Sequence, residues 1–400
     1  MINSREIYMK WVERVIDSEF VKIITGVRRS GKSMILQMVY DYIIARNTPK
    51  ENVLFFNFES NKLNPYKTQE ALLKYIFEQI GDTKEKIYFL FDEIQEVENW
   101  QNVVNGLRVD FNCEIYITGS NAMLLSGELA TYLTGRYIEL KVFPLSFKEY
   151  LQFTKTEIDS SKIDVKFKEF MEWGGFPMLP AINDKILKKA VLESIFDSIL
   201  LKDVALRGVI KEKNVLLKIT NYLLDVIGNP VSAKGIADYL TSSGLKTNHT
   251  SVAKYLNLLE EAFIFYKTDR YDIRGKNYLK TLGKYYAVDN GLRNIKLGKS
   301  GNFGSQLENI VFIELKRRGF DVFVGNYDNK EIDFVCFKNG NTEYYQVAYQ
   351  MPQNDSREQD NLLILKDNYK KTIITANRAD VGEIDGIPIV YIVDFLLEDY

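Results

Sequence analysis

A short glycine-rich segment near the N-terminus constrains this chain more than any other feature. Residues 26–33 read Gly-Val-Arg-Arg-Ser-Gly-Lys-Ser, between the apolar run at residues 20–25 and a helical pattern over residues 33–45. A glycine-rich turn between a strand and a helix directs backbone N–H groups and the helix N-terminus at one point, where an anion is favoured. The spacing matches G-x-x-x-x-G-K-[ST], a phosphate-binding pattern, and the flanking elements disfavour a plain turn with an incidental lysine.

The loop side chains have distinct expected roles. Lys32 is a mobile cation for the terminal phosphates and is expected to assist catalysis, and the Ser33 hydroxyl is expected to bind Mg²⁺. The expected ATP-binding residues are Gly26, Val27, Arg28, Arg29, Ser30, Gly31, Lys32, Ser33 and Met34.

A second apolar run, residues 87–91, ends in two carboxylates, Asp92 and Glu93. The carboxyl ends of parallel strands meet at one edge of a sheet, so both acids are expected near the loop. Asp92 is predicted to hold Mg²⁺ and Glu93 to polarise the water that attacks the γ-phosphate. The competing interpretation of an Asp-Glu pair after a strand is a solvated turn.

Two further segments supply candidates for the same site. A third strand-like run, residues 114–118, is followed by Gly-Ser-Asn, in which Ser120 or Asn121 could position the water; such a turn also forms for conformational reasons alone. Arg136 is either an ordinary surface residue or an arginine finger for the γ-phosphate. The second interpretation makes a homo-oligomer a candidate assembly.

The middle of the chain suggests a nucleic-acid interface. Residues 232–256 are typical of helix-turn-helix and are followed by a hairpin-like stretch that could form a wing. Residues 201–300 carry 17 Lys/Arg against 9 Asp/Glu, so duplex DNA is a candidate partner through residues 213–290, although such segments also serve as protein-binding modules. The expected buried face is Ile236, Ala237, Leu240, Val252, Leu256 and Leu259; the expected groove-facing residues are Thr247, Asn248, Ser251 and Lys254, and the expected basic patch is Arg270, Arg274, Lys276, Lys280 and Lys284.

With these residues assembled, the chain resembles a prokaryotic family of AAA+-like P-loop ATPases that carry an extra C-terminal domain. The resemblance implies an α/β fold with four parts: a P-loop ATPase domain with a parallel sheet at 1–150, a helical lid at 151–212, a winged-helix segment at 213–300, and an α/β domain similar to PD-(D/E)xK nucleases at 301–400. Motifs that carry it are residues 26–33, 91–95 with Trp100, 118–120 with 135–136, 143–147, 174–177, 289–293, and Leu307-Glu308 through 331–334.

The nuclease-like part is expected to be degenerate. Glu308, Glu331 and Asp333 fit the acids of such a site, but the matching strand has Gln346 and Ala348 where the nucleases have glutamate and lysine. Loss of a carboxylate and of the lysine makes metal-dependent cleavage doubtful. A fold used for binding or packing is the preferred interpretation.

Composition removes several other classes. The single histidine, His249, and the two distant cysteines, Cys113 and Cys336, exclude a disulfide framework and a zinc site rich in cysteine or histidine. No apolar run approaches the ~18–20 residues of a membrane span, so a cytoplasmic protein without membrane contact is expected. The leading hypothesis is Mg²⁺-dependent ATP hydrolysis that rearranges the lid, the winged helix and the nuclease-like domain. The alternatives are a DNA-binding regulatory module with ATP as a slow switch, and an active metal-dependent nuclease.

Overall fold

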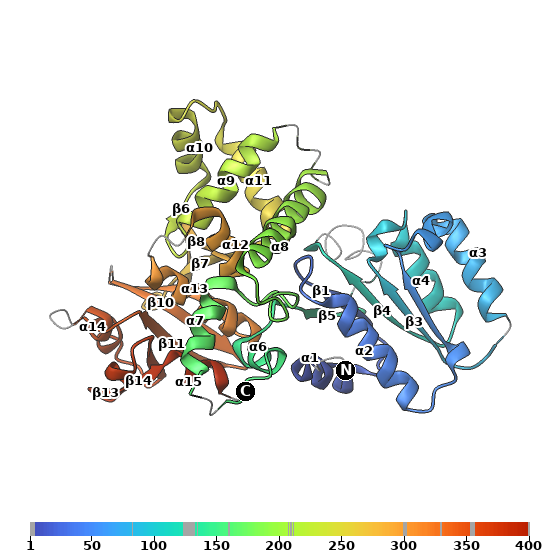
Figure 1. Ribbon diagram of the computed structural model, residues 1–400, viewed down its shortest axis with the longest axis horizontal. Coiled ribbons are helices and arrows are strands. Elements are labelled where there is room, and N and C mark those ends of the chain that lie inside the picture. Colours follow the sequence, from blue (N-terminus) through green and yellow to red (C-terminus); the bar gives the residue numbers. More distant parts are fainter. Residues whose placement is uncertain are drawn as a thin grey trace. The chain divides into compact units, whose positions relative to one another are not determined.

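The chain forms two compact units, which are described separately (Figure 1). The first contains Met1–Phe143 and Glu261–Phe263, and the second contains Pro144–Glu260 and Ile264–Tyr400. The computed structural model describes residues 5–81, 83–122, 133, 135–158, 161–206, 208, 210, 212–298, 302–328, 330–352 and 357–398. None of the helices within these ranges is both long and apolar enough to cross a membrane.

A five-stranded sheet forms the centre of the first unit, and all of its neighbouring strands are parallel. The strand order is β2-β3-β4-β1-β5, so β4 lies between β1 and β3. This arrangement confirms the predicted parallel α/β sheet, and it brings the carboxyl ends of three strands together at one edge. The strands are β1 Val21–Thr25, β2 Val53–Asn57, β3 Ile87–Asp92, β4 Cys113–Gly119 and β5 Tyr137–Lys141.

Helices cover both faces of this sheet (Figure 1). Successive strand residues alternate between the faces: Phe89 packs in the cluster with α3 and α4, whereas Leu90 packs with α1 and α2. Strands buried on both faces need nearly continuous apolar sequence, which is what the runs in β1 and β3 supply. The helices are α1 Glu6–Val15, α2 Lys32–Ala45, α3 Gln69–Ile80 and α4 Trp100–Asp110, with 3-10 turns at Lys50–Asn52, Asn61–Tyr66 and Ile94–Glu96.

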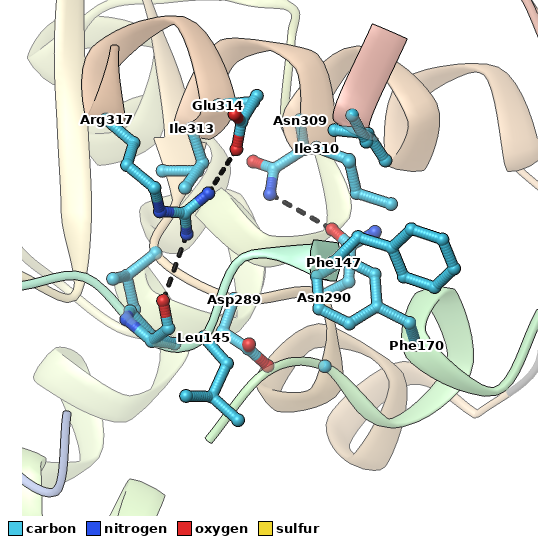
Figure 2. A pocket seen from close by; sticks show the side chains of 14 residues that line it. Leu145, Phe147, Phe170, Asp289, Asn290, Asn309, Ile310, Ile313, Glu314 and Arg317 are labelled. Atoms are coloured by element: carbon cyan, nitrogen blue, oxygen red, sulfur yellow. Dashed lines mark hydrogen bonds and ion pairs between the residues drawn. The ribbon is translucent and has the colours of Figure 1, made fainter. Parts of the chain in front are cut away.

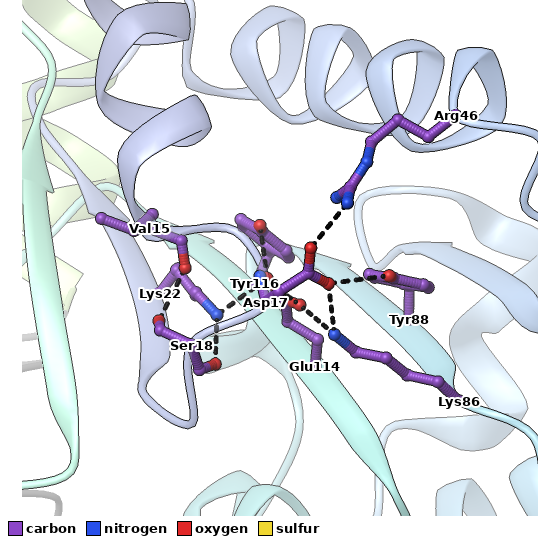
Figure 3. Close-up of polar contacts among 9 residues, drawn as sticks. All are labelled: Val15, Asp17, Ser18, Lys22, Arg46, Lys86, Tyr88, Glu114 and Tyr116. Atoms are coloured by element: carbon purple, nitrogen blue, oxygen red, sulfur yellow. Dashed lines mark hydrogen bonds and ion pairs between the residues drawn. The ribbon is translucent and has the colours of Figure 1, made fainter.

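A buried ion-pair network lies at the edge where these strands begin (Figure 3). Lys22 of β1 is fully buried, and its Nζ lies 2.8 Å from Glu114 Oε1 on β4 and donates to the carbonyl of Ser18. Lys86 contacts Asp17 at 2.6 Å and Glu114 at 2.8 Å. Burial lowers the pKa of Lys22, and the Glu114 carboxylate opposes this shift. The network joins the loop before β1 to β4 at the edge of the sheet where these strands begin.

The second unit is built on a nine-stranded sheet of order β13-β14-β12-β11-β10-β9-β7-β8-β6. The hairpin β7–β8 joins the later strands because β7 runs parallel to β9, with Arg270 opposite Val324. One sheet therefore passes through segments 213–300 and 301–400, and the four-part division stays a prediction. The strands are β6 Pro230–Val231, β7 Phe265–Asp272, β8 Asn277–Ala287, β9 Asp321–Tyr327, β10 Lys330–Lys338, β11 Asn341–Ala348, β12 Lys370–Thr375, β13 Gly382–Ile384 and β14 Ile387–Tyr391.

Helices of the second unit fill the sequence between and before these strands. A π-helical stretch, Ile199–Leu206, follows α8 directly, and a 3-10 turn spans Arg378–Asp380. The helices are α6 Phe147–Phe153, α7 Ile163–Trp173, α8 Lys185–Ser198, α9 Lys213–Asp225, α10 Ala233–Ser242, α11 His249–Glu261, α12 Asn290–Leu297, α13 Phe303–Arg317, α14 Arg357–Leu363 and α15 Ile392–Leu397.

The expected buried face of the α10–α11 pair is confirmed, because all six of its apolar residues are buried. Asn248 and Lys254 are exposed, as expected of groove-facing residues, and Thr247 and Ser251 are half-buried. The winged-helix assignment itself stays a prediction.

The basic patch expected on the following hairpin is largely paired within the unit. Arg274 lies 2.9 Å from Asp328, and Arg270 lies 3.7 Å from Glu331. Lys284 is buried, so the expectation that it lies on a surface for phosphates is wrong. The Lys280 side chain lies outside the described part of the structure.

Three of the sequence motifs meet around a small cavity of about 30 Å³ (Figure 2). Asp289, which precedes α12, accepts hydrogen bonds from the N–H groups of Gly175 at 2.6 Å and Gly291 at 2.8 Å. A Cβ on Gly174 would lie 1.8 Å from Asp289 Oδ1, which requires glycine there. The hydrogen bonds of Asp289 therefore hold these segments together around the cavity.

Candidate nucleotide-binding site

The glycine-rich loop follows β1 directly and leads into α2. Gly26 has φ +145°, and a Cβ there would lie 2.1 Å from the carbonyl oxygen of Val142. Gly31 and Arg29 also have positive φ, at +102° and +68°. A chain of such turns leaves successive N–H groups directed into one concavity at the start of a helix, which is the geometry that binds phosphate. The predicted position of the loop between strand and helix is therefore correct.

Lys32 begins α2 and is buried. Its Nζ donates hydrogen bonds to the carbonyl oxygens of Gly26 at 3.0 Å and Val27 at 3.2 Å. It also lies 3.7 Å from Glu93 Oε1. The ammonium thus lies against the loop and close to the acid that was expected to activate water.

The two expected metal ligands are hydrogen-bonded to each other. Ser33 Oγ donates to Asp92 Oδ1 at 3.0 Å, and Thr118 Oγ1 donates to the same oxygen at 2.6 Å. Burial raises the pKa of Asp92, while these two hydroxyls lower it. A hydroxyl and a carboxylate from adjacent elements are hard oxygen ligands, which fits Mg²⁺.

Glu93 directly follows β3 and has the left-handed backbone conformation, with φ +54°. Non-glycine residues in this region are uncommon and cluster at functional sites. Its N–H donates to Thr118 Oγ1 at 2.9 Å, and its Oε2 accepts a hydrogen bond from Gln95 Nε2. The other amide atom, Gln95 Oε1, is buried and has no hydrogen-bond partner among the described residues.

Thr118 and Gln95 are contributors that chemical reasoning on the sequence did not single out. Thr118 is the last but one residue of β4 and bridges Asp92 and Glu93, while Ser120 and Asn121 follow it and are buried. The signal that could have found Thr118 is a hydroxyl residue at the carboxyl end of β4, the strand that lies between β1 and β3 in the sheet. The role of Asn121 in positioning water stays a prediction.

Arg136 lies away from these residues. Its carbonyl accepts a hydrogen bond from the N–H of Val21, at the start of β1, whereas the loop follows the other end of that strand. The strand has five residues, so four steps of ~3.3 Å separate its two ends by about 13 Å. Arg136 is exposed there, so the structure does not bring it to the loop of its own chain.

The remaining loop residues border the site. Arg28 forms an ion pair of 3.2 Å with Glu59, and Arg29 and Met34 are exposed. Beneath the loop, Arg5 is 1% exposed and donates to the carbonyl oxygen of Ser30. The sequence offers no local sign of this contact, because 25 positions separate its two residues.

Comparison with known proteins matches two parts of the chain to family models. Residues 18–151 match a family model described as "AAA domain", and residues 164–302 match one described as "Domain of unknown function (DUF8612)". The Walker-type ATPase PABY2304 of Pyrococcus abyssi is 15% identical and superimposes with a TM-score of 0.50, over 74% of this chain and 96% of that chain. At this identity the likeness shows a shared fold.

Two relatives extend over most of the chain. An uncharacterized protein of Haemophilus influenzae is 49% identical over 99% of this chain and 98% of its own length. The uncharacterized protein MJ1544 of Methanocaldococcus jannaschii is 34% identical over 84% of this chain and 77% of its own length. The chain therefore belongs to the family of these two proteins, and its residues 18–151 form an AAA domain.

Proposed function

We propose that this protein binds ATP with Mg²⁺ at residues 26–34 and hydrolyses it. The observation that carries the proposal is the convergence of Lys32, Asp92 and Glu93 at the carboxyl edge of three adjacent parallel strands, joined by the hydroxyls of Ser33 and Thr118. Such an edge is where open α/β sheets bind their ligands. A phosphate-binding loop, a hydroxyl and two carboxylates are the parts that phosphoryl transfer from a nucleotide uses.

Each side chain has a separate role in this proposal. The loop N–H groups and Lys32 bind the phosphates, and Ser33 and Asp92 hold Mg²⁺, which neutralises charge on the phosphate oxygens. Phosphate oxygens compete for the Lys32 ammonium, which now lies near Glu93. Glu93 then accepts a proton from the attacking water molecule. The side-chain carbonyl oxygen of Gln95 accepts a hydrogen bond from the other hydrogen of that water.

The test separates binding from turnover. Lys32→Ala is expected to abolish binding of a fluorescent ATP analogue, and Glu93→Gln is expected to bind it normally while releasing phosphate at least 100-fold more slowly. Lys74→Ala and Glu78→Gln, on the exposed side of α3, are the matched controls. Normal turnover by Glu93→Gln would disprove its role, and normal binding by Lys32→Ala would disprove the site.

We further propose that Arg136 acts on a nucleotide held by a neighbouring copy of the chain. Its exposure at the edge opposite the loop supports action between subunits and disfavours action within one. Arg136→Ala and Lys32→Ala should each be inactive, and a mixture of the two should regain part of the activity because some interfaces then pair an intact loop with an intact arginine. Full activity of Arg136→Ala alone would contradict this role.

A second candidate function is duplex DNA binding by a winged-helix segment at 213–300, with ATP as a switch. The exposed polar side of α10–α11, which carries Lys234, Lys246 and Lys254, favours it. Replacing these three lysines by alanine should weaken DNA binding and reduce its salt dependence, by a slope of about one for each lost phosphate contact. The control replaces Lys10, Lys74 and Lys84 of the first unit. ATP turnover that is negligible with and without DNA would favour ATP as a switch over ATP hydrolysis that drives domain rearrangement.

For residues 301–400 we propose a nuclease-like fold that does not cleave DNA. For residues 151–212 we propose a helical lid. Gln346 on β11 accepts a hydrogen bond from the N–H of Asp333 through its side-chain oxygen, and Ala348 supplies no cation. Metal-dependent nicking of DNA by the intact chain that disappears in Asp333→Ala would overturn this assignment.

A further inference from the structure

Carboxylates from two elements of the second unit surround one buried ammonium. Lys284 of β8 is 3% exposed, and its Nζ lies 3.2 Å from Glu308 Oε1 on α13 and 2.8 Å from Glu331 Oε1 on β10. Tyr286, two residues further along β8, donates to Glu308 Oε1 at 2.6 Å. The hairpin therefore places one cation and one hydroxyl donor among acids that follow it in the sequence.

A third carboxylate, Asp333, belongs to the same cluster. Its Oδ2 accepts a hydrogen bond from the N–H of Val347 at 2.8 Å. Burial and the charge of Glu308 raise the pKa of Asp333 well above its ordinary value, and Lys284 opposes this shift. The carboxylates thus outnumber the single fully enclosed cation.

Carboxylates that lie close together and partly out of water need a positive charge among them, because they repel one another. Burial alone would lower the pKa of Lys284, but Glu308, Asp333 and Glu331 outweigh it and hold that pKa above its ordinary value. The two carboxylates around Nζ favour the ammonium form of this lysine. Its 2.8 Å distance to Glu331 is that of a charge-assisted hydrogen bond, and the 3.2 Å contact with Glu308 is longer.

With the lysine ammonium between them, these acids do not form a metal site. In the ranges that the structure describes, no three histidine, cysteine, aspartate or glutamate side chains are arranged to hold one. The position between Glu308 and Glu331 is filled by Nζ of the same chain.

We propose that Lys284 is the resident cation of the site formed by Glu308, Glu331 and Asp333, and that its ammonium stands where a divalent cation would otherwise bind. The site then fastens the hairpin β7–β8 to α13 and β10 and excludes divalent metal ions. This inference does not depend on ATP binding or hydrolysis, which concern the other unit.

The test measures binding of Mn²⁺ to the nucleotide-free full chain by the electron paramagnetic resonance signal of the free ion. An Asp92→Asn background removes the metal ligand of the first unit. Lys284→Met, which keeps an unbranched chain as far as Cε and removes the ammonium, is expected to bind one more Mn²⁺ than the parent. The extra site should be absent from Lys284→Arg, which keeps the charge, and from Lys284→Met/Asp333→Asn. Mn²⁺ should raise the melting temperature of Lys284→Met and leave that of the parent unchanged.

Two results would overturn the proposal. One is Mn²⁺ binding by the parent that disappears in Asp333→Asn, because the carboxylates would then take a metal despite the lysine. The other is a folded Lys284→Met that gains no Mn²⁺ site. If Lys284→Met is unfolded in metal-free buffer, refolding followed by circular dichroism must succeed with Mn²⁺ and fail with Na⁺ at equal ionic strength. Failure with both ions equally rejects the proposal.

Discussion

The guanidinium of Arg5 donates one hydrogen bond of 2.8 Å to the carbonyl oxygen of Ser30, inside the glycine-rich loop, and one of 3.0 Å to that of Phe143. Phe143 is the last residue of the first unit before the chain enters the second. Its N–H donates to the hydroxyl of Tyr8, so α1 and the residue that precedes it bind both backbone groups of Phe143. Arg5 therefore binds both the glycine-rich loop and the segment at which the chain leaves the first unit.

Arg5→Ala is expected to weaken ATP binding about tenfold, because the buried carbonyl oxygens of Ser30 and Phe143 would lose their donor at about 1–3 kcal/mol each. Titration with a fluorescent ATP analogue measures the affinity, and urea unfolding measures the accompanying loss of stability. Arg14→Ala, an exposed arginine on the same helix, is the control. Unchanged affinity in a folded Arg5→Ala would show that the loop keeps its shape without this contact.

Gln95→Ala is expected to lower kcat by roughly 10–100-fold and to leave the affinity for ATP nearly unchanged. Gln95 contacts Glu93 but neither Lys32 nor Ser33 in the contacts described, so its loss should misplace the general base without removing a phosphate contact. Phosphate release at saturating ATP measures kcat, and Gln79→Ala on the exposed side of α3 is the control. A rise in the Kd for ATP that matched the fall in kcat would instead place Gln95 in nucleotide binding.

Lys22→Met is expected to destabilise the first unit by about 3–5 kcal/mol, because it leaves the buried Glu114 with only the partly exposed Lys86 as a cation. Lys86→Met should cost less, since that lysine is partly exposed. Both lie at the edge of the sheet opposite the glycine-rich loop, so ATP affinity of the folded fraction should stay at the parental value. Urea unfolding gives the free energies, and equal effects of the two substitutions would contradict the assigned burial.

The stability of the second unit should fall as pH rises from about 4 to about 7 because of Asp289. Burial raises the pKa of Asp289 to about 7, although the N–H groups of Gly175 and Gly291 favour its charged form. The unfolded chain releases this proton near pH 4, whereas the folded chain retains it to about pH 7, so the unfolded state gains relative stability across that window. Below pH 4 the penalty is absent, and above pH 7 it is complete.

The measurement for Asp289 is the free energy of unfolding of the parent minus that of Asp289→Asn, taken at several pH values. Asparagine does not titrate, so its lost hydrogen bond adds a constant, and the difference should decrease by a few kcal/mol across the window. A difference that stays level between pH 4 and pH 7 would mean that the carboxyl group is already ionised at pH 4 in the folded protein.

How much of the molecule the sequence predicts depends on the distance along the chain over which each contact acts. The loop at 26–33 and the pair Asp92-Glu93 could be predicted, because a strand, a turn and a helix in succession are written in adjacent residues. The strand β5 was not expected, since Tyr137–Lys141 contains Glu139 and Lys141 and gives no continuous apolar run. Its parallel pairing with β1 depends on residues more than 100 positions away.

Lys284 is a second case in which a contact distant along the chain decides the outcome. From the sequence it counts as one more cation of a basic segment, and an excess of basic residues favours a polyanionic partner. The structure places it against Glu308 and Glu331, from the acidic segment that follows. Local charge thus indicates a partner, but only the tertiary pairing shows that the partner is in the same chain.

The parallel pairing of β7 with β9 has a consequence for any shortened form of the protein. A chain that stopped at residue 300 would lose the strand beside β7 and expose a row of unpaired N–H and C=O groups, which is a template for aggregation. It would also remove both acids that pair with the Lys284 ammonium. Expression of residues 144–300 should therefore give insoluble material.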